Sequence, residues 1–186
     1  EKINWEFWIK ISFNTSSNNF VRYYIYSDSS HLKNATSAIY FKFGEDADKI
    51  QIATLNNHVE TILYTDTTFK TANTTNEFTC KMEYVSDTLY KVVLMDLSNK
   101  MSIDTIQIPL LQIEKIYTGL YCKYTISNAT KVYLDNVKVG PKTESEKVIG
   151  TSPQIGDLLI SEVLFNPKDG CVDFVELYNP TSKIID

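Results

Sequence analysis

Apolar side chains alternate with polar ones along most of the first 140 residues. In residues 4–13, the odd-numbered positions are occupied by Trp5, Phe7, Ile9, Ile11 and Phe13. The even-numbered positions are mostly polar and include Trp8. A period of two is typical of a β-strand with one buried face. Residues 4–13 are therefore predicted to form a long strand that points Trp8 away from the core.

The same alternation continues after a polar turn at residues 14–19. Val21, Tyr23 and Ile25 alternate with Arg22, Tyr24 and Tyr26. Further strands are predicted at 38–44, 49–55, 59–64, 77–85, 88–96, 105–111, 116–125 and 130–139. Pro109 indicates that the 105–111 strand lies at a sheet edge or carries a bulge, because proline cannot donate to the ladder. No segment longer than ten residues carries a convincing helical stripe, so an all-β antiparallel sandwich or jelly roll is expected.

The pattern changes at Gly140, where a polar stretch bracketed by Gly and Pro begins. We expect a sandwich domain over residues 1–140, a linker over 141–156 and a separate segment over 157–186. In that segment two apolar runs, 157–165 and 172–178, flank a turn-rich loop at 166–170 and predict a hairpin. An isolated hairpin is marginally stable in water. The segment is therefore expected to pack on the first domain, on a second copy or on sequence beyond residue 186.

Two stretches of the sequence resemble known families. Residues 5–44 (WEFWIKISFNTSSNNF onward) are similar to the start of the concanavalin A-like, laminin G or glucanase-type jelly roll of bacterial surface proteins, and 117–139 resemble its closing strands, with Asp135 and Asn136 at the matched pair. The tail, GDLLISEVLFNP followed by DFVELYNP, resembles the opening hairpin of the immunoglobulin-like lamin tail domain. The resemblance implies a secreted or cell-surface protein and an incomplete lamin tail domain, as in a piece of a longer chain.

Composition and charge exclude several classes of partner. The chain has 186 residues, is 43% hydrophobic and 22% charged, and carries a formal net charge of −5. Arg22 is its one arginine, so no basic stripe is available for nucleic acid. No apolar run approaches the length of a membrane span, so membrane insertion is not expected.

The sequence gives little reason to expect a metal or a cofactor. Its three cysteines lack a C-x-x-C spacing and its two histidines are isolated, which argues against a closed zinc site. A disulfide between Cys80 and Cys122 is compatible with the sequence, although buried free thiols are favoured. The acidic loop at residues 44–48 has oxygen ligands for calcium, but a simply solvated turn is the favoured interpretation. We expect no cofactor and assign no metal ligand.

Catalytic signatures are also missing. Glycoside hydrolases need two carboxylates on one strand face, and the family's Glu-x-Asp-x-x-Glu spacing does not occur. His31 and His58 fall in expected loops, without the context of a nucleophilic triad. Cys171, next to Gly170 in the predicted turn, is the cysteine expected to be exposed. The sequence therefore predicts a protein that is not an enzyme.

A row of outward aromatic side chains is the remaining functional candidate. By alternation, the candidate ligand-binding residues are Trp8, Arg22, Tyr24, Tyr26 and Tyr40. Rings beside cationic donors suit sugars, because an aromatic face packs on the apolar side of a pyranose. The competing and favoured explanation is structural, with these rings covered by a loop or a neighbouring domain.

Two functions follow from these observations. The first is a secreted or cell-surface module for glycan binding or adhesion. The second is a structural spacer or anchoring domain without a ligand of its own. Candidate partners are a glycan or a cell-surface protein, and exposed strand edges favour self-association.

Overall fold

The structure, a computed structural model, describes residues 3–45, 47–109, 116–141, 156, 158–164 and 174–180. The chain divides into two compact units, Glu1–Lys142 and Thr143–Asp186.

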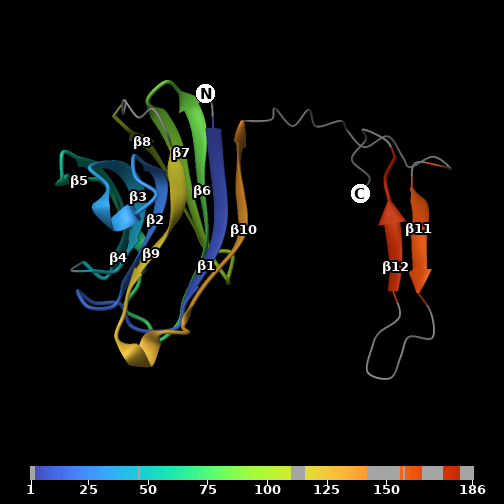
Figure 1. Cartoon of the computed structure of the whole chain (residues 1–186), viewed down its shortest axis with the longest axis horizontal. Coiled ribbons are helices and arrows are strands. Elements are labelled where there is room, and N and C mark those ends of the chain that lie inside the picture. The colour runs from blue at the N-terminus through green and yellow to red at the C-terminus, as the bar shows by residue number, and fades with distance from the viewer. Residues whose placement is uncertain are drawn as a thin grey trace. The chain divides into compact units, whose positions relative to one another are not determined.

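The first unit consists of two antiparallel five-stranded sheets (Figure 1). The first sheet has the order β10 (Val132–Pro141), β1 (Ile3–Ile11), β6 (Asn76–Ser86), β7 (Leu89–Asp96) and β8 (Met101–Gln107). The second sheet has the order β5 (Val59–Lys70), β4 (Lys49–Asn56), β3 (Ser37–Phe43), β2 (Phe20–Ser27) and β9 (Tyr117–Lys123). Two short 3₁₀ turns, η1 (Leu32–Asn34) and η2 (Ile126–Asn128), lie in the connections. The prediction of an all-β antiparallel sandwich is confirmed.

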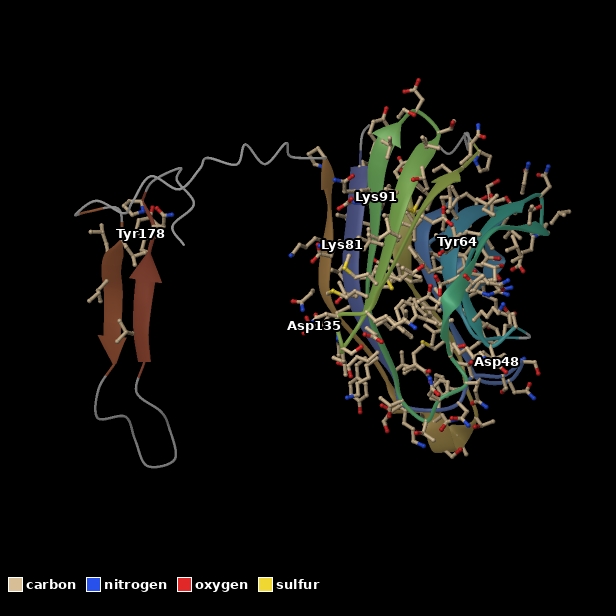
Figure 2. The ribbon with its side chains drawn as sticks, turned by 180° about the vertical axis from the view of Figure 1, so that it is seen from behind. Asp48, Tyr64, Lys81, Lys91, Asp135 and Tyr178 are labelled. Carbon is tan, nitrogen blue, oxygen red and sulfur yellow. The ribbon has the colours of Figure 1, made fainter. Side chains whose placement is uncertain are left out.

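The core lies between the sheets and is built from the alternating apolar positions. Phe7 of β1 stacks on Tyr23 of β2 with ring centroids 4.0 Å apart, and it meets Phe41 of β3 edge-on at 5.3 Å. All three side chains are buried. Figure 2 shows the side chains that fill the space between the layers. Burial of these rings is the main stabilising contribution, because apolar area removed from water dominates folding energetics.

Strand β8 of the first sheet begins and ends earlier in the chain than predicted. β8 spans Met101–Gln107, whereas alternation placed it at 105–111, and Pro109 follows the strand. β8 lies at one end of the sheet order, which is the edge position that the proline indicated.

The two described cysteines do not form a disulfide. Cys80 on β6 is buried and Cys122 on β9 is half-buried, and both are free thiols that pack in the core between the sheets. Burial raises the pKa of both, to about 11 for Cys122. The sequence left a disulfide open, and the structure corrects that alternative in favour of free thiols.

The described residues of the second unit contain one antiparallel pair of strands, β11 (Leu159–Leu164) and β12 (Phe174–Tyr178). Glu162 and Glu176 lie opposite each other in its register. The expected loop at 166–170, Cys171 and residues 142–155 of the expected linker lie outside the described residues. Among the helices that the structure describes, none has the length and apolarity needed to span a bilayer.

Candidate ligand-binding site

The five predicted site residues do not form one surface. Trp8 lies on β1, on the outer side of the first sheet, and its Nε1 donates a hydrogen bond to Glu77 Oε1 over 3.2 Å. Arg22, Tyr24 and Tyr40 lie on β2 and β3, on the outer side of the second sheet. The core separates the two groups, so a single ligand cannot contact both.

Tyr26 does not face outward, and that part of the prediction is wrong. The pairing of β2 with β3 shifts by one residue after Tyr24, which lies opposite Tyr40, so that Tyr26 lies opposite Ile39. Such a β-bulge turns the following side chain to the other face. Tyr26 therefore packs into the core, where its ring meets Trp5 edge-on at 4.8 Å.

Tyr24 and Tyr40 face outward but are covered. Their exposed fractions are 3% and 0%, and their ring centroids lie 4.7 Å apart. They form a small second apolar cluster with Ala35 and with Leu32 of η1, in agreement with the structural explanation offered for outward rings. Substituting either tyrosine would disturb packing as well as any ligand contact.

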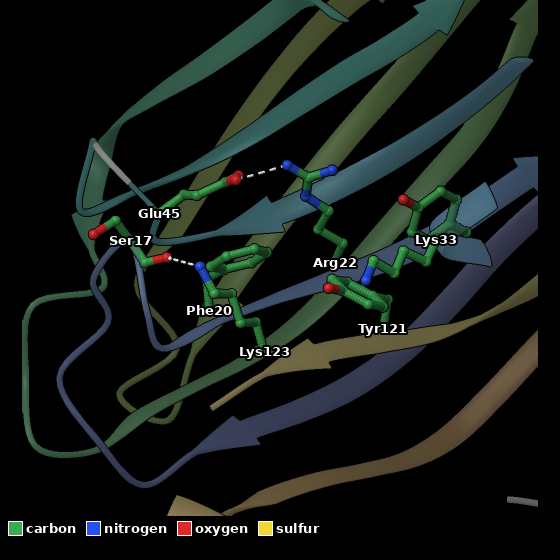
Figure 3. Close-up of a pocket in the computed structure, with 8 residues that line it drawn as sticks. Ser17, Phe20, Arg22, Lys33, Glu45, Tyr121 and Lys123 are labelled. Carbon is green, nitrogen blue, oxygen red and sulfur yellow. Dashed lines mark hydrogen bonds and ion pairs between the residues drawn. The ribbon is translucent and has the colours of Figure 1, made fainter. Parts of the chain in front are cut away.

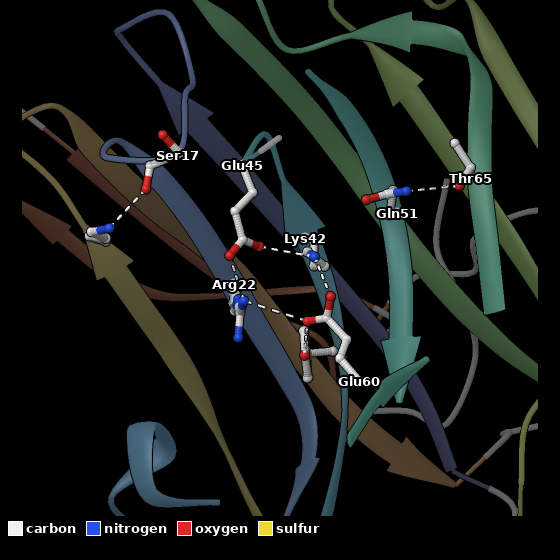
Figure 4. A network of polar contacts seen from close by, with 9 residues as sticks. Ser17, Arg22, Lys42, Glu45, Gln51, Glu60 and Thr65 are labelled. Carbon is white, nitrogen blue, oxygen red and sulfur yellow. Dashed lines mark hydrogen bonds and ion pairs between the residues drawn. The ribbon is translucent and has the colours of Figure 1, made fainter. Parts of the chain in front are cut away.

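A network of four charged side chains lies beside this cluster (Figure 4). Arg22 Nη2 lies 2.6 Å from Glu45 Oε1 and 3.5 Å from Glu60 Oε2. Lys42 Nζ lies 3.0 Å from Glu45 Oε2 and 2.6 Å from Glu60 Oε1. Each carboxylate is thus shared by both cations, and the four charges cancel within the network.

The network brings together two carboxylates that lie 15 positions apart in the sequence, a grouping that alternation did not reveal. Glycosidases use such pairs, but one member must hold a proton at working pH. Burial alone would raise the pKa of Glu60, but hydrogen bonds from Lys42 and Tyr40 and the charge of Arg22 outweigh burial and leave this pKa below its usual value. Glu60 is therefore unsuited to act as a general acid, and Glu45 is occupied by the same two cations.

An open pocket of about 420 Å³ lies at the edge of this network (Figure 3). We call it the Arg22 pocket. Its walls come from β2, β9, η1 and the turns that follow β1 and β3. It is lined by Ser17, Phe20, Arg22, Tyr24, Lys33, Glu45, Tyr121 and Lys123.

The register between β2 and β9 assembles this pocket. Arg22 lies opposite Tyr121, and Phe20 lies opposite Lys123. About 100 residues separate these partners in the chain, so periodicity could place Tyr121 and Lys123 on a strand face but could not pair that face with β2. Sequence reasoning therefore identified Arg22 and Tyr24 but missed Phe20, Lys33, Tyr121 and Lys123.

Trp8 borders a smaller pocket on the opposite side of the sandwich. Its volume is about 150 Å³, and Glu77, Met95 and Asn99 are among the residues that line it. Lys10 forms a 3.3 Å ion pair with Glu77, so the carboxylate beside the indole already has a cationic partner. The larger Arg22 pocket is the better candidate for a sugar.

The acidic loop after β3 is engaged by the protein itself. Glu45 contacts Arg22 and Lys42, and Asp48 Oδ1 accepts a hydrogen bond from Thr15. Asp46 lies outside the described residues. Across the part of the chain that the structure describes, no group of three or more His, Cys, Asp or Glu side chains is arranged to hold a metal ion.

No protein-family model and no curated protein sequence matches the chain. Solved structures do match it. A carbohydrate-binding module from Bacillus subtilis (CBM66) is similar to 74% of this chain over 74% of its own length, with 13% sequence identity and a TM-score of 0.51. A galectin-Ib from Xenopus laevis is 14% identical over 73% of this chain and 90% of its own, with a TM-score of 0.34. At these identities the similarity to the bacterial module establishes a shared β-sandwich fold.

Proposed function

We propose that the β-sandwich unit is a non-catalytic glycan-binding module whose ligand occupies the Arg22 pocket. The observation that carries the proposal is the half-buried ring of Tyr121 beside the cationic donors Arg22 and Lys123 in an open pocket. A ring face offers a packing surface for the C–H side of a pyranose, while the donors bind its hydroxyls. The fold shared with a carbohydrate-binding module supports this function.

A glycan-array screen of the soluble chain, with and without calcium, tests the proposal. Tyr121→Ala removes the ring from the pocket, and Trp8→Ala removes the ring from the opposite face. Binding that is lost in Tyr121→Ala and retained in Trp8→Ala is expected. Loss in Trp8→Ala alone would move the site to the first sheet, and no binding by folded protein over a broad array would overturn the function.

We also propose the setting in which this module works. Residues 1–140 form the binding domain, 141–156 connect it, and 157–186 begin a lamin-tail-like domain of a secreted or surface protein. The similarity of residues 156–179 to the lamin tail hairpin and the antiparallel pairing of β11 with β12 support this assignment. A structural spacer is the alternative, supported by the covering of Tyr24 and Tyr40.

A further inference from the structure

The charges lining the Arg22 pocket are unbalanced. Arg22 and Glu45, the one lining carboxylate, belong to the charge-balanced network, so the excess of positive charge comes from the other two lining cations, Lys33 and Lys123. Glu45 is already paired with Arg22 at 2.6 Å and with Lys42 at 3.0 Å. The pocket is therefore locally positive, although the whole chain has a formal net charge of −5.

Two of these cations retain unused donors. The exposed ammonium group of Lys33 has no hydrogen-bond or ion-pair partner within the described ranges, and Figure 3 shows it pointing toward Tyr121. Lys123 Nζ donates one hydrogen bond, to the carbonyl oxygen of Ser17 over 2.9 Å. An ammonium group has three donors, so most of the donors of both lysines are free for a ligand.

Arg22 and Lys123 each lie near the ring of Phe20. The guanidinium carbon of Arg22 lies 5.3 Å, and Lys123 Nζ 5.7 Å, from the centroid of the Phe20 ring. The Nε–H of Arg22 is buried and has no acceptor among the described residues. The guanidinium is therefore not fully satisfied by Glu45 and Glu60.

Cations gathered in a partly enclosed pocket repel one another, and an anion bound among them relieves this repulsion. A neutral sugar would leave the imbalance in place. A sugar with one anionic substituent could pack its ring on Tyr121 and place the charge among the lysines.

We propose that the Arg22 pocket selects sugars that carry an anionic substituent, either a carboxylate or a sulfate ester. This inference rests on the proposed glycan-binding function and specifies its ligand class. Selection comes from Lys33 and Lys123, whereas Tyr121 provides the contact that any sugar shares.

Calorimetric titration with matched oligosaccharides tests the ligand class. The probes are trigalacturonic acid, its neutral methyl ester and a sulfated galactotriose with its unsulfated parent. The acid or the sulfated sugar is expected to bind at least about fivefold more tightly than its neutral counterpart, the effect of one exposed charge contact at about 4 Å. This preference should shrink as salt is raised. The charged probe that binds identifies the source of the anionic group.

Variants separate the lysines from the ring. Lys33→Gln and Lys123→Gln should each reduce the preference for the charged probe over its neutral counterpart by roughly fivefold. Lys91→Gln is the matched control, since it removes one positive charge from an exposed ion pair with Glu83 on the first sheet. It should change neither affinity.

The outcomes of these experiments distinguish the selection of anionic sugars from the proposed glycan-binding function on which it rests. Equal binding of charged and neutral probes, with loss of both in Tyr121→Ala, would overturn the charge selection and leave the glycan site in place. Failure of every probe and of the glycan array would overturn both. An equal loss of affinity in Lys91→Gln would show that only net charge matters and would also overturn the selection.

Discussion

Tyr40 donates a hydrogen bond from its hydroxyl to Glu60, and this contact joins the covered apolar cluster to the charged network. Tyr40 belongs to β3 and is fully buried, while Glu60 is at the start of β5. The same carboxylate lies 2.6 Å from Lys42 Nζ, whose side chain is 9% exposed. Glu60 thus satisfies a buried hydroxyl and a nearly buried ammonium together.

Replacing Glu60 with glutamine should destabilise the first unit. The change leaves Lys42 with Glu45 as its remaining carboxylate partner among the described residues, and it weakens the acceptor for Tyr40. An incompletely satisfied buried group costs about 1–3 kcal/mol. Chemical denaturation measures the loss, and Glu83→Gln, which breaks an exposed pair with Lys91, should change the free energy of unfolding by about 0.5 kcal/mol or less. Equal effects of the two substitutions would contradict the role of Glu60.

The stability of the first unit should depend on pH through the carboxylate of Glu60. The pKa of Glu60 in the folded chain lies below its usual value of 4.5, so the unfolded chain takes up this proton at a higher pH than the folded chain does. The ionised Glu60 therefore contributes its full stabilisation above the unfolded-state pKa of about 4.5. This contribution is lost as the pH falls through the pKa of the folded state. Denaturation curves between pH 6 and pH 3 should show a shallower loss of stability in Glu60→Gln than in the unsubstituted chain. Parallel curves would show that Glu60 does not contribute.

Gly44 cannot carry a larger side chain. Its φ is +88°, and an added Cβ would lie 2.1 Å from Cβ of buried Thr15. Gly44→Ala should therefore destabilise by about 2 kcal/mol or more, with a lower melting temperature. Gly140→Ala is the control, because nothing lies within 4 Å of its added Cβ. Similar melting temperatures for the two variants would contradict the close approach of Thr15.

Asp66 on β5 is a buried carboxylate that connects the second sheet to the first through hydrogen bonds. It accepts hydrogen bonds from the backbone N–H groups of Thr68 and Phe69 and from the hydroxyls of Tyr64 and Ser102, the last on β8. Asp66→Ala leaves these donors without their acceptor and should destabilise by about 1–3 kcal/mol or more. Asp66→Asn keeps one acceptor oxygen and should lose less. A smaller loss in Asp66→Ala than in Asp66→Asn would contradict the acceptor role.

The thiols should differ in reactivity. Cys80 is fully buried and the pKa of Cys122 is raised to about 11 by burial, so both should react slowly with iodoacetamide at pH 8, because the thiolate is the reactive form. Denaturant should expose both to rapid labelling, which peptide mass mapping can assign. Cys171, expected from the sequence to be exposed, should label first in the folded chain. Rapid labelling of Cys80 in folded protein would contradict the buried core position.

The strands could be predicted from the sequence because each depends on local alternation. The predicted strand 4–13 corresponds to β1, which begins one residue earlier and ends two residues earlier. The predicted strand 49–55 corresponds to β4, which ends one residue later. A strand with one buried face must alternate, so its pattern is visible without its partners. The η1 turn that covers Tyr24 and Tyr40 could not be predicted in this way, because a contact between a turn and a sheet does not follow from the alternation of side chains along one strand.

The sequence by itself determined the all-β class, the alternating apolar positions of strands such as β1 and the outward direction of Trp8, Arg22, Tyr24 and Tyr40. Tertiary structure alone decided that Trp8 and Arg22 lie on opposite faces, since strand order is not encoded in alternation. It also decided that Tyr26 turns inward, because a β-bulge shifts the period by one residue. Tertiary structure also decided the Arg22 pocket, because the pairing of β2 with β9 brings Tyr121 and Lys123 to Arg22 and Phe20 across about 100 residues of chain.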